Sequence, residues 1–96
     1  MKEALTKEQM FEELKKEFSH VYEWTDEPNT IYEEHAHKGK VCFYVVEGSI
    51  LMNIDGVHST IKKGERLDVP VDHPHTAKVG TEGCTFIVGE DIEGDS

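Results

Sequence analysis

Two pairs of histidines, each separated by a single residue, are the groups in this chain best suited to chemistry. They are His35 with His37 and His73 with His75. Alternate residues of a β-strand point to the same face, so two imidazoles spaced in this way could offer two nitrogen ligands to one metal ion. The chain holds six histidines in 96 residues, and such short motifs also arise by chance. The pairs alone are therefore weak support for a metal site.

The segments that carry these histidines have the composition of short β-strands separated by turn residues. Asp55-Gly56 predicts a tight hairpin, because such a turn needs residues that tolerate a positive φ angle. Further turns are expected at 47–48 and 80–83. Strands at this regular spacing indicate an antiparallel sandwich or barrel. The expected strands are His20–Thr25, Thr30–His37, Val41–Glu47, Ser49–Asp55, Val57–Lys62, Glu65–Pro70, His75–Val79 and Cys84–Gly89.

An amphipathic helix is expected before the strands. Thr6 and Gln9 fit a capping box, in which each side chain bonds the backbone of the other residue. An apolar stripe follows at helical spacing, formed by Phe11, Leu14 and Phe18. We expect this helix to pack on the outside of the barrel or at a dimer contact. The prediction is a single domain, with the helix at 1–19, the β-barrel at 20–90 and an acidic flexible tail at 91–96.

The charge balance excludes several kinds of partner. The chain has 10 Lys and Arg against 20 Asp and Glu, for a net charge of -10. An acidic surface repels nucleic acid and anionic membranes, so neither is expected as a partner. Cys42 and Cys84 lie in apolar surroundings and are expected to be buried, reduced thiols. The N-terminal stretch lacks the apolar core of a signal peptide, which favours a cytoplasmic protein.

The residues around the histidines resemble the two sequence motifs of the cupin family. His35-x-His37 followed by Gly48 matches the first motif, and Gly64, Pro70 and His75 match the second. The resemblance implies an all-β jelly-roll barrel, also called a double-stranded β-helix, to which the expected α-helix is added. It implies that His35, His37 and His75 are metal ligands. Small single-domain cupins commonly pair, so the resemblance also favours a homodimer.

Three positions depart from the motifs. Asn29 and Asp72 stand where the motifs have glycine, and both residue types tolerate left-handed backbone geometry. Val41 stands where the first motif has a glutamate that binds the metal. The expected site is therefore three neutral imidazoles without a carboxylate, which should weaken metal binding.

Three functions are open at this stage. The site could hold a divalent transition metal (Zn, Fe, Ni, Cu or Mn) and act on a small organic substrate, in a dioxygenase-like or isomerase-like reaction. It could instead bind a small ligand or metal without catalysis, as a sensor would. The third possibility is a metal-free structural barrel. The cupin fold does not decide among them, and no residue identifies a catalytic base.

Other residues are weaker candidates for the site. Glu33 shares strand parity with His35, but a solvated carboxylate is favoured. His73 lies beyond Pro74 from His75 and is expected to be a turn residue rather than a fourth ligand. The remaining candidates are favoured as surface or packing residues: His20, His58, Tyr22, Trp24, Tyr32, Tyr44, and the inward-facing Val41, Phe43 and Val45.

Overall fold

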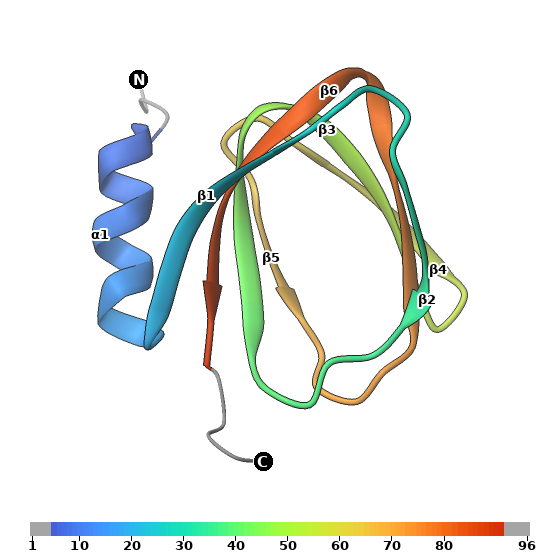
Figure 1. Cartoon of the computed structure of the whole chain (residues 1–96), viewed down its shortest axis with the longest axis horizontal. Coiled ribbons are helices and arrows are strands. Elements are labelled where there is room, and N and C mark those ends of the chain that lie inside the picture. The colour runs from blue at the N-terminus through green and yellow to red at the C-terminus, as the bar shows by residue number, and fades with distance from the viewer. Residues whose placement is uncertain (1–4, 92–96) are drawn as a thin grey trace.

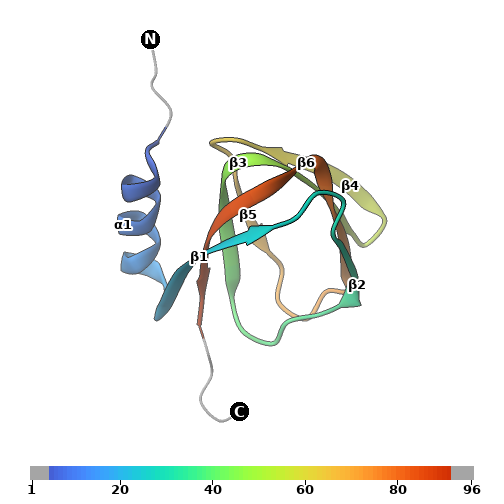
Figure 2. The same cartoon turned by 45° about the horizontal axis from the view of Figure 1, so that its top comes forward.

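Two long strands, β3 (Val41–Ile54) and β6 (His75–Glu90), pair antiparallel along their length and carry the rest of the sheet. The computed structural model describes residues 5–91. The other strands of this part of the chain join that pair: β1 (His20–Asp26) and β2 (Ile31–His35) pair with β6, and β4 (Val57–Lys62) and β5 (Arg66–Val69) pair with β3. Figures 1 and 2 show the sheet curving into a barrel. The predicted all-β jelly-roll fold is confirmed.

β3 and β6 each contain two of the predicted strands, and the turns predicted at 47–48 and 80–83 are bends within them. Gly48 and Gly83 have φ angles of 82° and 81°. A Cβ atom on Gly48 would lie 2.0 Å from the carbonyl oxygen of Gly83. The pairing shifts register at this bend, between Gly48 and Ile50. Glycine is therefore needed for both the backbone conformation and the close approach, and it bends the ladder without ending it.

Alternate residues of β3 serve two separate cores. Phe43 and Val45 point into the barrel, where they pack with apolar residues of β3, β4, β5 and β6. Cys42 and Tyr44 point outward and pack with Ile87 of β6 beneath the helix. The predicted inward parity of Val41, Phe43 and Val45 is confirmed.

Helix α1 (Lys7–Glu17) covers the outer core, alongside β1 (Figure 1). Thr6 and Gln9 form the predicted capping box, with both reciprocal hydrogen bonds present. Met10 and Leu14 are buried against the outer face of the sheet. The helix therefore lies on the outer face of the sheet, away from the barrel interior.

Arg66 joins the helix to β5. Its guanidinium donates to Glu13 Oε2 at 2.7 Å and to Glu17 Oε1 at 2.8 Å. The Tyr44 hydroxyl donates to the same Glu13 oxygen at 2.6 Å. The Arg66 side chain is 22% exposed, so these ion pairs are partly shielded from water and fix how the helix lies on the sheet.

Other sequence expectations have mixed outcomes. Cys42 and Cys84 are buried and free, as predicted. No helix within residues 5–91 is long and apolar enough to cross a membrane. The flexible tail predicted at 91–96 lies outside the described residues, apart from Asp91.

Leu14 is fully buried in the outer core, so its truncation should reduce the stability of the protein strongly. Leu14→Ala should lower the free energy of unfolding by about 2–5 kcal/mol, because it removes apolar burial and leaves a cavity. Urea denaturation followed by circular dichroism measures this change. Glu12→Ala, at an exposed position of the same helix, is the matched control and should change stability by less than about 0.5 kcal/mol. Equal losses in the two variants would contradict the packing of Leu14 in the outer core.

Candidate metal centre

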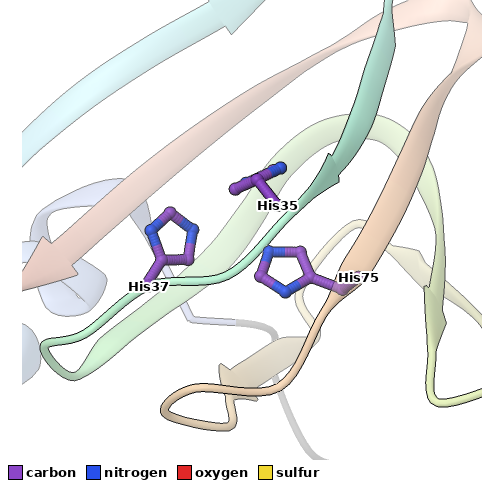
Figure 3. Close-up of side chains that lie close together, drawn as sticks. All are labelled: His35, His37 and His75. Carbon is purple, nitrogen blue, oxygen red and sulfur yellow. The ribbon is translucent and has the colours of Figure 1, made fainter.

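His35, His37 and His75 form a close cluster at one end of the barrel (Figure 3). His35 ends β2 and His75 begins β6, and the two are register partners. Ring centroids are 4.4 Å apart for His35 and His75, 4.8 Å for His35 and His37, and 5.1 Å for His37 and His75. One nitrogen from each ring lies within 4.8 Å of the other two. The three histidines selected from the sequence are therefore together in space.

The reason given for the His35 and His37 pairing needs correction, because β2 ends at His35 and His37 lies in the following loop. Backbone contacts place it instead. The His37 carbonyl accepts a hydrogen bond from the backbone N–H of Asp72 at 2.8 Å. Asp72 has a φ angle of 60°, so its left-handed conformation belongs to the turn that meets this loop. The two histidine-bearing segments are thus joined directly through their main chains.

Backbone carbonyls orient two of the three rings. His35 Nδ1 lies 2.8 Å from the carbonyl oxygen of Glu33, and His75 Nδ1 lies 3.0 Å from that of His73. In a neutral ring that makes this bond, Nδ1 carries the hydrogen and donates it, so Nε2 keeps its lone pair. This is how metal-binding histidines are commonly held.

The three rings differ in burial. His75 is 3% exposed, His37 is half-buried and His35 is exposed. Burial, reinforced by the neighbouring His35 and His75, lowers the pKa of His37, and the charge of Glu90 opposes this. A lowered pKa favours the neutral imidazole, which is the form that binds a metal.

The cluster opens onto a cavity of about 550 Å³ inside the barrel. The walls are mostly aliphatic and aromatic. Val41, at the position expected to hold glutamate, is one of the lining residues. The others are His20, Tyr22, Trp24, Tyr32, His35, His37, Phe43, Ile50, Met52, Val69, His75, Ala77, Phe86, Val88 and Glu90.

Aromatic residues of β1 and β2 form part of the wall, although packing was the favoured interpretation for them. Asp26 accepts a hydrogen bond from Trp24 Nε1 at 2.9 Å and another from the Tyr32 hydroxyl. Burial, with the contribution of Asp26, raises the pKa of Tyr32 to about 12. The Tyr32 hydroxyl therefore stays protonated at neutral pH, and one carboxylate fixes two rings of the wall. Tyr44, by contrast, packs beneath the helix as expected.

The two weaker site candidates lie outside the cluster, as favoured. Glu33 is exposed, because a register shift between Tyr32 and His35 interrupts strand alternation. His73 is exposed and its Nδ1 lies 2.6 Å from Asp55 Oδ2, which joins its turn to the β3–β4 hairpin. Both contribute only the carbonyls that orient the cluster.

Sequence reasoning missed two residues of the cavity. His20 was favoured as a surface or packing residue; it is exposed, and it also lines the cavity. Its alternation with Tyr22 and Trp24 in β1 was the available signal. Glu90 was placed at the end of the barrel without a role, and it also lines the cavity. It has the parity of Phe86 and Val88, but its neighbours across the sheet become visible only in the structure.

A family model described as a cupin domain matches residues 22–89. This chain belongs to the cupin family. Among solved structures, an RmlC-like cupin from Shewanella frigidimarina is 27% identical, with a TM-score of 0.65, over 78% of this chain and 68% of that one. No curated protein matched the sequence.

Two enzymes are also among the structural neighbours of this cupin. Bacillus subtilis oxalate decarboxylase, described with Mn(II) centres, is 25% identical with a TM-score of 0.68, over 79% of this chain but only 22% of the enzyme. The DMSP lyase DddQ from Ruegeria pomeroyi is 16% identical with a TM-score of 0.69, over 79% of this chain and 39% of the lyase. At 16% identity, the likeness to the lyase shows only that the two proteins share a fold.

The structure explains two of the three departures from the cupin motifs. Asn29 and Asp72, which replace glycine, have φ angles of 64° and 60°. Both therefore adopt the left-handed geometry that a glycine would adopt, as their residue types allow. The third departure, Val41, leaves a hydrocarbon side chain on the cavity wall.

The orientation of the rings can be tested without any ligand. At about pH 8, where imidazoles are largely neutral, His35 and His75 should carry their hydrogen on Nδ1, because that atom donates to a backbone carbonyl. Two-bond ¹H–¹⁵N correlation spectra distinguish the two tautomers. His58, which is exposed, serves as the internal reference for a solvated ring. A hydrogen on Nε2 of either cluster residue would contradict the assignment.

Proposed function

We propose that this cupin binds a divalent transition metal through His35, His37 and His75 and holds a small organic ligand beside it. The observation that carries the proposal is the close approach of three imidazole nitrogens, within 4.8 Å of one another. Metal–nitrogen bonds of about 2.1 Å place the ligands of one ion roughly 3 Å apart, a spacing that small side-chain rotations can reach.

The donor set fits a transition metal. Imidazole suits Zn, Fe, Ni and Cu, and the oxalate decarboxylase neighbour has Mn(II) centres. Two of the rings present Nε2 because Nδ1 is occupied by a carbonyl. Three protein ligands also leave coordination positions open, which is typical of catalytic or ligand-binding centres rather than structural ones.

The cavity indicates the chemical class of the ligand. Its volume, about 550 Å³, lies within the range of roughly 300–1,000 Å³ for small-molecule sites. Among the described residues that line it, none is a lysine or arginine. The cavity therefore suits a largely apolar molecule with an oxygen, nitrogen or sulfur atom that can reach the metal, rather than a phosphorylated one.

Removing one histidine tests the metal site. Wild-type protein without an added histidine tag should bind about one equivalent of Zn²⁺ or Co²⁺ in isothermal titration calorimetry. His75→Ala should weaken binding on the order of 100-fold or more, because only two ligands remain. His58→Ala removes an exposed histidine of β4 and is the matched control, with unchanged affinity.

Two results would overturn this proposal. Wild-type protein that takes up less than about a tenth of an equivalent of any transition metal would favour the metal-free barrel. Metal retained by a variant that carries both His35→Ala and His75→Ala would show that the ligand set is wrong.

A catalytic role is the second candidate, supported by the open coordination positions and by the oxalate decarboxylase among the structural neighbours. A bound metal would supply Lewis acidity or O₂ chemistry, while the aromatic wall would orient the ligand. We expect the iron-loaded protein to consume oxygen with one member of a panel of thiols, diketones and small phenols. Binding without turnover, seen as quenching of Trp24 fluorescence, would instead favour a non-catalytic ligand-binding cupin.

A further inference from the structure

The proposed centre has an electrostatic problem. Imidazole ligands add no charge to a metal centre, and Val41 stands where the first cupin motif would supply a carboxylate. Moving a divalent cation from water to a site with apolar walls costs free energy, unless a negative charge lies near the cation. Glu90 is the one acidic residue among the described residues that line the cavity.

Strand pairing places Glu90 directly beside the missing ligand. Val41 begins β3, Glu90 ends β6, and the two are register partners. Directly opposed residues of antiparallel strands have Cβ atoms about 4.5–5.5 Å apart and point to the same face. Both line the cavity. The Glu90 side chain therefore starts one strand away from position 41 and enters the same space.

The loop that carries His37 is fixed against this end of β6. The backbone N–H of Asp91 donates to the Lys40 carbonyl at 3.0 Å. A Cβ atom on Gly39 would lie 2.3 Å from the Asp91 carbonyl oxygen, so only glycine permits the approach. These contacts hold Glu90 near His37, and the two side chains interact electrostatically.

Tyr22 of β1 lies next to Glu90 on the cavity wall, because its register partner is Val88, two residues before Glu90 in β6. Burial, with the neighbouring Glu90 carboxylate as the second cause, raises the pKa of the Tyr22 hydroxyl to about 12. The hydroxyl is therefore a donor at any physiological pH. Tyr22 also lines the cavity, so a protonated hydroxyl lies on the same wall as the Glu90 carboxylate.

We propose that Glu90 supplies the negative charge that this cupin lacks at Val41, acting on the metal from the neighbouring strand. The inference rests on the metal site proposed above. Within residues 5–91, the close cluster consists of the three histidines alone, so Glu90 acts through a water or ligand held between its carboxylate and the metal. It is a positioning residue, and it favours ligands that present a hydrogen-bond donor next to the atom that binds the metal.

Neutralising the carboxylate tests this role by metal affinity. Glu90→Gln keeps the shape of the side chain and should weaken Co²⁺ or Zn²⁺ binding about 10-fold in isothermal titration calorimetry, at the lower end of the effect of outer partners of a metal site. Glu82→Gln removes the same charge from an exposed position of β6 and should leave the affinity unchanged. Thermal melts confirm that both variants are folded.

A second substitution should rescue the first. Adding Val41→Glu to Glu90→Gln restores a carboxylate one strand away, at the motif position, and should return the affinity to the wild-type value or above it. The visible spectrum of bound Co²⁺ should then change, because a carboxylate enters the coordination sphere. If Glu90→Gln does not fold, Tyr22→Phe removes only the hydroxyl beside Glu90 and should weaken binding about 3-fold, a fraction of the effect of losing the charge.

The outcomes separate the two proposals. A wild-type protein that binds no metal would overturn both. Wild-type protein that binds metal, together with Glu90→Gln of equal affinity, would overturn the role of Glu90 and leave the histidine site intact. Equal weakening by Glu82→Gln would assign the effect to net charge and would also overturn it.

Discussion

The antiparallel pairing of β3 with β6 is the constraint on which the rest of the structure depends. Every other strand of residues 5–91 attaches to one member of this pair. The pair also contributes residues to both cores, with Phe43 inside the barrel and Cys42 beneath the helix. Gly48 and Gly83 let the ladder bend without interruption. One continuous ladder thus encloses the cavity and supports the helix.

The same ladder determines the electrostatics of the candidate site. At one end of the β3–β6 ladder, the apolar Val41 pairs with Glu90. At the opposite end, Ile54 pairs with His75. Backbone carbonyls orient His35 and His75, and they do not add a net charge. The charge near the site and the orientation of the histidine rings are therefore set by different residues. A substitution of Glu90 can change the charge while the ring orientation stays the same.

Features governed by local rules could be predicted from the sequence. These include the capping box at Thr6 and the left-handed conformations of Asn29 and Asp72. The gathering of the three histidines followed from motif spacing, although His37 proved to lie in a loop. The sequence could not place Glu90 at the cavity, because its position depends on the cross-strand register of β3 and β6. It also depends on the bend at 80–83, which the sequence pattern predicted as a turn between two strands. Non-local pairing is the information that a single sequence lacks.

The pairing of His35 with His75 has a consequence for how the protein folds. The two residues are separated by β3, β4 and β5 along the chain, so their loop must close before they can meet, at an entropic cost that grows with its length. The site therefore forms only when the barrel is complete. A metal that requires all three rings would bind the native state in preference to partly folded ones, and it would draw the folding equilibrium toward the closed barrel by mass action.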